Sequence, residues 1–563
     1  MVRLIYLAES SKSPTFRVPI IDSATYDEHA RALLATGAFD PQFFWQGFFY
    51  PFYLAVVYLV AGGSMLWARL IQIVLGSLLC SGVYGLGSRI FDRRTGIAAG
   101  LIASLYGPLI FYDVEILDSG FSAIWALVLV LLLLRAESAK GVWLAFLLGL
   151  CGGLSVITRG TFLPFFVVAC AWLIHAWRRG AAPWSVIAAR AGLVIAGFLL
   201  VVLPVASFCQ KATTHFNFLA ESGPINLYIG NNPEADRTIM IRPGAEWREL
   251  TRLPMVKGSM SDAEDRKVFT RLFFDYVKSE PGGYAKGLGE KTIQFLSSRE
   301  LPRNDDIYVA RKYSKLLGAL VWKAGGFGFP FGILLPLALV GIVRSFRRIP
   351  VPIYLLLILY PAAIIAVFVS GRFRIPLIPM LAVPAAAGIV YLLDALRLRR
   401  WLTAAGTVGA IAVVAAASSA AGPFTVERYN YEAEMHSIVG FELMKEKRLP
   451  AAVEQFNEAL RLDPGWGDAH KYLGLIMSEE RRPAEAAEHL QRALAAEPDS
   501  YLLRYYLGVT LLNLGKTDEA LQYLEGARGA AAAAKEDRLV GEIDRVLKSM
   551  ASRRSGATAP HGR

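Results

Sequence analysis

The sequence predicts an all-α membrane protein, in which a polytopic bundle of transmembrane helices is followed by a C-terminal α-solenoid of helical repeats. The bundle is indicated by a mean hydropathy of +0.40 with only 19% charged residues over 563 residues, values outside the range of ordinary soluble domains. The solenoid is indicated by small residues that recur near the end of the chain with a period of about 34 residues.

Ten apolar stretches are long enough, or nearly so, to cross a hydrocarbon core of roughly 30 Å. They cover residues 66–88, 95–112, 117–135, 141–158, 161–178, 191–208, 326–345, 350–369, 376–396 and 401–421. A further apolar stretch, 48–62, is short, aromatic and contains Pro51. We expect this stretch to form a helix that lies at the depth of the lipid headgroups.

Basic residues predict the orientation of the spans, because short loops rich in Lys and Arg stay inside. With the N-terminus outside, the short inside loops hold Arg89, Arg93, Arg94, Arg135, Lys140, Arg178, Arg179, Arg190, Arg344, Arg347, Arg348, Arg397, Arg399 and Arg400. The short outside loops hold only Arg159, Arg372 and Arg374. Residues 1–65, 209–325 and 422 onward are therefore expected outside. Since no apolar segment precedes the polar residues 1–47, we also expect the true start, with one more span, to lie upstream.

Charge and cysteine usage exclude two classes of site. The net charge of +12 comes from arginines in short clusters between apolar runs, not from one basic face, so nucleic-acid binding is not expected. The four cysteines show no CxxC or Cys/His spacing, so neither a disulfide framework nor a zinc site is predicted. We predict no metal and no cofactor.

The end of the chain repeats the pattern of tetratricopeptide units. Gly440, Ala452 and Ala459 each recur one and two periods later, at Gly474, Gly508, Ala486, Ala520, Ala493 and Ala527. Small residues at these places let the two helices of a hairpin cross closely. We predict a linker at 422–432, repeats at 433–550 and a disordered tail at 551–563. Such arrays bind a peptide or a partner protein on their concave face.

Three predicted outside segments carry ionisable groups beside membrane spans. The first holds Asp22, Tyr26 and Asp27 ahead of an aromatic segment with Tyr50, the second holds Asp113 and Glu115, and the third is the set of outside arginines. Carboxylates faced by arginines at the mouth of a bundle suit an anionic lipid headgroup and a sugar acceptor, whose hydroxyl needs a base. Each group also has a plain alternative. Asp22 could cap a helix, Asp113 and Glu115 could mark a span boundary, and the arginines could anchor the interface.

With these residues the chain resembles the GT-C superfamily of membrane glycosyltransferases, in particular bacterial glycosyltransferase family 39 and its relatives that resemble dolichyl-phosphate-mannose protein mannosyltransferases. The resemblance covers residues 10–400. Asp22 with Tyr26 matches the catalytic loop, Glu115 the acidic residue of the second outside loop, and Arg159 a basic residue after the next hairpin. GRFRIP, with Arg372 and Arg374, resembles the basic motif before a late span.

The resemblance implies an inverting transfer from a polyprenyl-phosphate-linked sugar to a glycan, lipid or protein outside a bacterial plasma membrane. Asp22 and Glu115 are then the candidate catalytic residues, and Arg159, Arg372 and Arg374 bind the donor phosphate. Tyr26, Asp27, Asp113 and Tyr50 line the pocket. The alternative is a non-catalytic scaffold of an envelope-assembly complex that acts through its repeats. A transporter is disfavoured, because the centres of the spans are nearly free of charge.

Overall fold

The computed structural model describes residues 1–138, 141–242, 245–256 and 262–557. It divides into two compact units, Met1–Tyr429 and Asn430–Arg563. Both are helical, and β1 (Trp322–Ala324) and β2 (Phe327–Phe329) are the only strands in the described ranges. The predicted all-α fold class is confirmed. Lys140, from the inside basic set, and residues 558–563 of the predicted tail lie outside the described residues.

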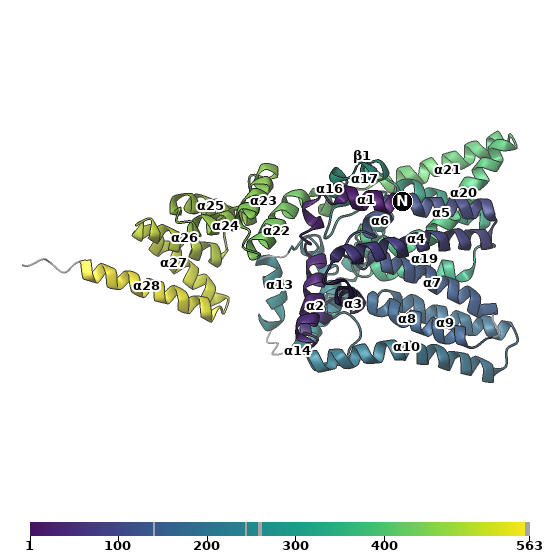
Figure 1. The fold of residues 1–563 in the computed structure, drawn as a ribbon, viewed down its shortest axis with the longest axis horizontal. Coiled ribbons are helices and arrows are strands. Elements are labelled where there is room, and N and C mark those ends of the chain that lie inside the picture. The colour runs from purple at the N-terminus through teal and green to yellow at the C-terminus, as the bar shows by residue number, and fades with distance from the viewer. Residues whose placement is uncertain (139–140, 243–244, 257–261, 558–563) are drawn as a thin grey trace, which may run out of the picture. The chain divides into compact units, whose positions relative to one another are not determined.

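Every predicted span coincides with a helix or with two consecutive helices of the first unit, which run side by side in Figure 1. These helices are α4 (Met65–Ile90), α5 (Arg93–Leu105) with α6 (Gly107–Tyr112), α7 (Ser119–Ser138), α8 (Trp143–Thr158), α9 (Phe162–Arg179), α10 (Trp184–Thr213), α18 (Phe331–Ser345), α19 (Val351–Ile365), η4 (Gly371–Leu377) with α20 (Ile378–Arg397), and α21 (Trp401–Ala420). Five segments are long and apolar enough to cross a membrane by themselves, namely Met65–Ile90, Ser119–Ser138, Trp184–Thr213, Gly371–Arg397 and Trp401–Ala420.

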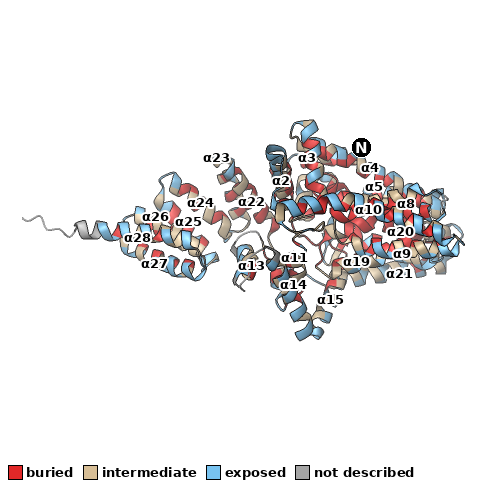
Figure 2. Cartoon of the chain, turned by 90° about the horizontal axis from the view of Figure 1, so that it is seen from below, coloured by how far each residue is buried: buried red, intermediate tan, exposed pale blue. Residues whose placement is uncertain are grey.

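The bundle has a packed interior and an apolar exterior. α8 and α10 approach closely because they meet at glycines: a Cβ on Gly149 would lie 2.0 Å from the carbonyl oxygen of Val194, and a Cβ on Gly197 would lie 2.2 Å from that of Phe146. Close backbone approach at small residues is typical of helix pairs in membranes. α10 and α21 keep large apolar side chains exposed, as Figure 2 shows by burial, and an apolar outer surface suits contact with lipid.

The structure differs from the predicted spans at three places. The span 95–112 is broken at Tyr106, where Pro108 starts the separate helix α6, because a proline is well tolerated only in the first turn of a helix. The span predicted at 326–345 begins at Phe331, since β1 and β2 form a hairpin around Gly325. α10 continues to Thr213, beyond the predicted end at 208.

One end of the bundle carries most of the chain that is not in spans. We call it the loop face and define it as residues 1–64, 113–118, 159–161, 214–242, 245–256, 262–330 and 366–377. Its N-terminal elements are α1 (Val2–Ser10), η1 (Pro14–Phe16), α2 (Asp22–Thr36), η2 (Pro41–Phe44) and α3 (Phe49–Ala61). Its long segment holds α11 (Gly223–Ile229), α12 (Ala235–Thr238), α13 (Ala245–Val256), α14 (Asp262–Ser279), α15 (Pro281–Leu296), α16 (Ile307–Ala310), η3 (Arg311–Tyr313) and α17 (Lys315–Leu320).

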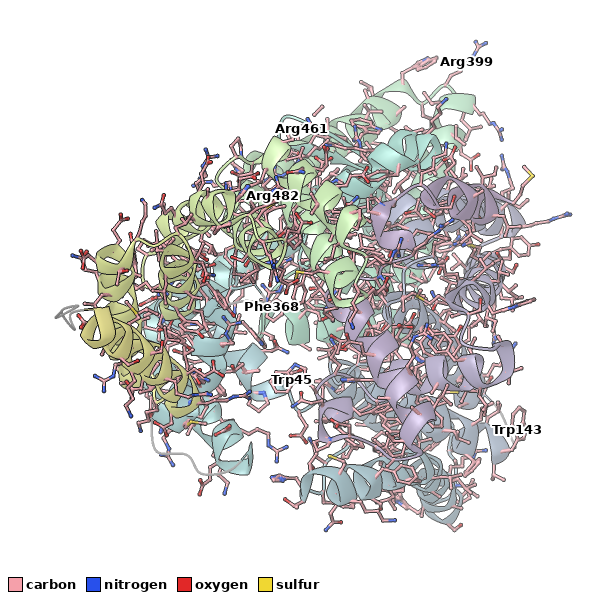
Figure 3. The ribbon with its side chains drawn as sticks, turned by 60° about the vertical axis from the view of Figure 1, so that its left-hand side comes forward. Trp45, Trp143, Phe368, Arg399, Arg461 and Arg482 are labelled. Carbon is pink, nitrogen blue, oxygen red and sulfur yellow. The ribbon has the colours of Figure 1, made fainter. Side chains whose placement is uncertain are left out.

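The opposite end holds the basic turns. Arg94 and Asp394 pair there at 3.6 Å. Figure 3 shows Trp143 and Arg399 far from Trp45 and Phe368, which belong to the loop face. Main-chain hydrogen bonds join the N-terminal segment of the loop face to its long segment. In one of them, the amide of Glu221 donates to the carbonyl of Phe44 at 2.9 Å.

The second unit is a stack of helical hairpins. Its helices are α22 (Tyr431–Lys445), α23 (Leu449–Leu462), α24 (Gly467–Glu479), α25 (Pro483–Ala496), α26 (Tyr501–Asn513), α27 (Thr517–Ala533) and α28 (Asp537–Ala557). Gly474 lies against Leu490, and Gly508 against Leu524, so small residues mark the crossings as predicted. The linker predicted at 422–432 contains the short helix η5 (Thr425–Arg428), and residues 551–557, predicted as disordered, are the end of α28.

Candidate active site

Asp22 stands at the first turn of α2, but its side chain does not cap that helix. The position before the helix is Ile21, whose φ of 50° is strained for a β-branched residue. The carboxylate of Asp22 instead accepts a hydrogen bond from Gln46 Nε2 at 2.8 Å and one from Arg372 Nη1 at 2.7 Å. The capping alternative is therefore wrong, and the strained turn holds Asp22 against residues far away in the sequence.

A second ion pair lies beside the first. Asp118, at the start of α7, accepts from Arg159 Nε at 2.9 Å and from Arg159 Nη2 at 2.7 Å, a two-point pair of planar groups. The guanidinium carbons of Arg159 and Arg372 lie 5.1 Å and 5.0 Å from the centre of the Phe373 ring. The Phe373 ring therefore connects the two arginines by cation–π contacts.

Backbone hydrogen bonds hold the turn between α6 and α7 in place. From α4, Gln72 Nε2 donates to the carbonyls of Asp113 at 3.2 Å and Glu115 at 2.9 Å, and Arg69 Nε donates to that of Val114 at 3.0 Å. The Tyr50 hydroxyl donates to Gln72 Oε1 at 2.7 Å. The turn that carries Glu115 is thus fixed by α3 and α4, while the carboxyl group of Glu115 takes no part in these bonds.

Burial and like charge perturb two carboxyl groups of the loop face. Burial raises the pKa of Glu115 to about 7, partly offset by the charge of Arg69. Burial and the charge of Glu115 raise the pKa of Asp305 well above its ordinary value, and Arg372 acts in the opposite direction. Carboxyl groups that hold a proton near neutral pH are typical of functional sites.

Several buried polar atoms of this region have no hydrogen-bond partner among the described residues, namely Gln46 Oε1, Arg372 Nε, Asn304 Nδ2 and Asp305 Oδ2. Buried polar atoms are nearly always paired in folded proteins, and the exceptions ask for a reason. Here they come from η2–α3, η4 and the segment before α16, which meet at the two ion pairs. A polar ligand would supply the missing partners.

Two of the predicted site residues have structural partners of their own. Asp113 is buried and accepts from Arg3 Nε at 2.6 Å. Asp27 accepts from Arg31 Nε at 2.8 Å and from the Tyr58 hydroxyl at 2.6 Å. Asp113 and Asp27 therefore hold α1 and α3 in place, apart from the pair of Asp22.

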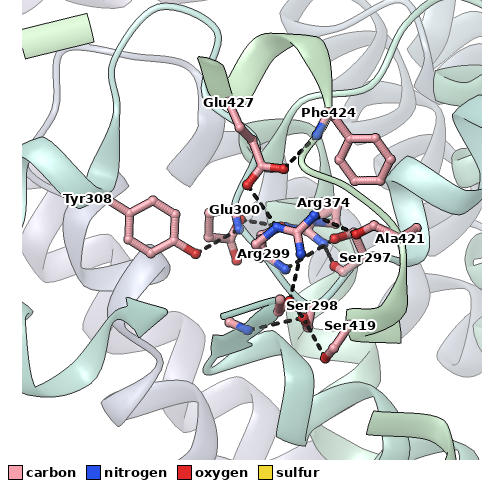
Figure 4. Close-up of polar contacts among 12 residues, drawn as sticks. Ser297, Ser298, Arg299, Glu300, Tyr308, Arg374, Ser419, Ala421, Phe424 and Glu427 are labelled. Carbon is pink, nitrogen blue, oxygen red and sulfur yellow. Dashed lines mark hydrogen bonds and ion pairs between the residues drawn. The ribbon is translucent and has the colours of Figure 1, made fainter. Parts of the chain in front are cut away.

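Arg374 is enclosed by the chain, as Figure 4 shows. Nη1 donates to the carbonyl of Ser297 at 2.6 Å, and Nη2 donates to the carbonyl of Arg299 at 2.6 Å and to Glu300 Oε2 at 2.8 Å. Its side chain exposes only 2% of its surface. This geometry does not favour the predicted contact with a donor phosphate and gives Arg374 the task of shaping residues 297–300.

The two predicted tyrosines lie in the wall behind Asp22. Tyr26 and Tyr50 are buried, with ring centres 4.9 Å apart in an edge-to-face contact. Of the predicted residues, the structure thus brings together Asp22, Tyr26, Tyr50, Arg159 and Arg372, while Glu115 lies within electrostatic reach of Asp305. Among the described residues, no three His, Cys, Asp or Glu side chains gather as a metal site.

Sequence reasoning missed Asp118, Gln46 and Asp305. Asp118 is the last charged residue before a long apolar run. A carboxylate at that place needs a buried partner, so its position could have indicated an ion pair. Gln46 stands within the aromatic segment and carries no distinctive pattern. Asp305 lies in the long loop directly after Asn304 and carries no distinctive pattern.

Two parts of the chain match known protein families in sequence. Residues 46–208 match the family model described as Dolichyl-phosphate-mannose-protein mannosyltransferase. This likeness to a GT-C-type family covers less than half of the chain, and the unit that contains it is called the GT-C region below. The matched residues include Gln46, Asp118 and Arg159. Residues 477–536 match a tetratricopeptide-repeat model, which confirms the predicted repeats there.

No curated protein matches the chain in sequence. Among solved structures, the oligosaccharyltransferase of Archaeoglobus fulgidus in its apo form shares 16% identity at a TM-score of 0.38 over 77% of this chain and 57% of that chain. The complex of AglB from the same organism with an inhibitory peptide and a dolichol-phosphate shares 16% identity at 0.38 over 81% and 58%. The chain thus spans just over half of the length of these proteins.

Proposed function

We propose that the GT-C region transfers one sugar from a polyprenyl-phosphate-linked donor to an acceptor on the extracytoplasmic side of a bacterial plasma membrane, with inversion at the anomeric carbon. The observation that carries the proposal is the contact between Asp22 and Arg372, 2.7 Å apart at the loop face. A base next to a cation that can bind phosphate is the minimum that glycosyl transfer from a phosphate donor requires.

In the proposed reaction, an acceptor hydroxyl attacks the anomeric carbon and loses its proton to a carboxylate oxygen of Asp22. The bond between the anomeric carbon and the phosphate oxygen breaks, and its electron pair stays with the leaving phosphate. Arg372 is the nearest cation to Asp22 and offsets the new negative charge. Attack from the face opposite the leaving group inverts the configuration.

The neighbouring residues take supporting roles. Arg159 is held by Asp118 and contacts the ring of Phe373, so it adds fixed positive charge beside Arg372. Tyr26 and Tyr50 form the wall behind Asp22. Glu115 and Asp305 face the region from two other segments and, as carboxyl groups, suit hydrogen bonds to sugar hydroxyls.

The repeats are proposed to recruit an acceptor or a partner protein. In the described part of the second unit, no large apolar side chain is among the strongly exposed ones. A polar surface of this kind is more suitable for reversible peptide binding than for permanent assembly. The proposed recruitment is independent of the chemistry at Asp22.

The test is sugar transfer by purified full-length protein in lipid nanodiscs with a polyprenyl-phosphate sugar and membrane extract as acceptor source. Asp22→Asn should lower kcat by about a hundredfold or more, because a general base contributes on that scale. Glu28→Gln is the control, since it neutralises an exposed carboxylate on the same helix and should keep activity. Full activity of folded Asp22→Asn would remove the base and favour the scaffold alternative.

A further inference from the structure

Each oxygen of the candidate base already accepts a hydrogen bond from a side chain. Oδ1 of Asp22 is engaged by Gln46 and Oδ2 by Arg372. Release of one of these donors would open an oxygen of Asp22 more fully to the acceptor hydroxyl, and the structure distinguishes the donor that is more easily released.

Arg372 is the more loosely held of the two arginines beside Phe373. Its pair with Asp22 uses one nitrogen, and the two side chains expose 14% and 20% of their surface. The pair of Arg159 with Asp118 uses two nitrogens and exposes 10% and 7%. The buried Nε of Arg372 also has no hydrogen-bond partner among the described residues, so one N–H of the fork is unsatisfied in this pair.

The Asp22 end of the pair remains fixed if Arg372 leaves. Gln46 continues to donate to Oδ1, and the main chain around Gln46 is joined to the long loop, because Trp45 accepts from the amide of Ser222 at 3.1 Å. The Phe373 ring offers Arg372 a surface over which its guanidinium can turn. Only the bond to Oδ2 changes in such a movement.

We propose that the donor phosphate switches on the base: it takes Arg372 from Asp22 and thereby frees Oδ2 for the acceptor hydroxyl. Gln46 is then a positioning residue that keeps Asp22 aimed, and Asp118 is a positioning residue that keeps Arg159 still. The inference rests on the proposed function, since it assigns an order to the same site: phosphate first, acceptor second. A phosphate offers the guanidinium two oxygens where Asp22 offers one.

The switch predicts an effect on binding that has the opposite direction to the effect on catalysis. In the wild type, a polyprenyl phosphate has to compete with Asp22 for Arg372. Asp22→Asn removes the competitor, so full-length protein in nanodiscs should bind undecaprenyl monophosphate about fivefold more tightly, the scale of one exposed ion pair. The gain should vanish in an Arg372→Gln background, which a double-mutant cycle measures directly.

Removal of any negative charge near the site could favour an anion, so the cycle needs a matched control. Asp118→Asn removes the same charge beside Arg159 and should give no comparable gain. A gain of Asp22→Asn that persists in the Arg372→Gln background, or no gain at all, would overturn the switch. If Asp22→Asn does not fold, Asp22→Ser in the same cycle gives the same reading. Sugar transfer is not measured in this cycle, so wild-type protein that transfers no sugar would refute the proposed function alone.

Discussion

Arg372 and Arg374 are two residues apart in η4, yet their guanidinium groups meet different surroundings. Arg372 pairs with Asp22 at the loop face, whereas Arg374 is closed in by the carbonyls of Ser297 and Arg299 and by the carboxylate of Glu300. Arg372 can exchange its partner for a ligand. Arg374 cannot leave its place without depriving buried acceptors of their hydrogen bonds.

Arg374→Gln should therefore be a stability variant. Breaking a buried, hydrogen-bonded ion pair costs about 3–5 kcal/mol, so thermal unfolding in detergent should shift to lower temperature and expression should fall. Arg372→Gln is the matched control and should change unfolding little while raising KM for the donor about tenfold or more. If Arg374→Gln unfolds like the wild type and raises KM for the donor instead, Arg374 contacts the phosphate after all.

Asp118→Asn should impair activity through Arg159. An asparagine side chain has only one accepting oxygen, so it cannot accept both hydrogen bonds from the guanidinium of Arg159. Arg159 then loses its fixed orientation beside Phe373. We expect kcat to fall by about tenfold with donor KM raised, because misplacement of a binding group costs on that scale. Restoration of activity by Asp118→Glu would show that the carboxylate, and not the residue size, is needed. Unchanged kinetics in Asp118→Asn would exclude the positioning role.

The pKa of Glu115, raised to about 7 by burial, predicts a stability that depends on pH. The folded chain holds this proton to higher pH than the unfolded chain, so its contribution is complete below the ordinary pKa of a glutamate and is lost as pH rises through 7. Glu115→Gln cannot ionise. It should gain about 1–3 kcal/mol relative to the wild type between pH 5 and pH 8, measured as the difference in melting temperature at each pH. A pH-independent difference would mean that Glu115 is ionised throughout.

Gly474→Val should unfold the repeats without loss of the membrane unit. An added Cβ would lie 2.8 Å from Leu490 Cγ, and overpacking of this kind costs about 1–3 kcal/mol. Gly529→Val, where a Cβ meets nothing within 4 Å, is the control in the same unit. Limited proteolysis should release the C-terminal unit in Gly474→Val only. Equal resistance of both variants to proteolysis would show that the helix crossing at Gly474 can accommodate a larger side chain.

The predicted orientation has a separate test. A reporter that is active only in the periplasm, fused after residue 563, should give signal, because ten spans from an outside N-terminus return the chain to the outside. A reporter fused after residue 346, in the turn between α18 and α19, should be silent. Signals of the opposite kind would reverse the faces and place Asp22 inside the cell.

The spans could be predicted because hydrophobicity over a window of this length is a strong local signal. The places where the observed helices differ from the predicted spans also have local causes. Pro108 divides the second span, and Gly325 with Gly326 turns the chain into a hairpin where an apolar run suggested a helix. The period of the repeats was equally legible, since Gly474 and Gly508 need the space of a missing side chain.

The pairing of charges could not be predicted to the same extent. Asp22 and Arg372 are 350 residues apart, and Asp118 and Arg159 are 41 apart, so no spacing rule connects them. Arg372 and Arg374 look alike in GRFRIP, and only the tertiary structure separates the ligand-facing side chain from the enclosed one. The burial of Glu115, which raises its pKa, also depends on segments that are far apart in the sequence.

Hydrogen bonds hold the end of α21 and the segment after it against the loop face. Arg299 donates to Glu427 Oε1 at 2.8 Å and to the carbonyl of Ala421 at 2.6 Å, and Ser298 Oγ lies 3.0 Å from Ser419 Oγ. Because the first repeat helix begins only a few residues later, at Tyr431, a partner bound by the repeats would be tethered to the membrane unit through a short segment of chain. A short tether of this kind acts as an effective concentration in the millimolar range, so a weakly bound acceptor would still meet the proposed site often.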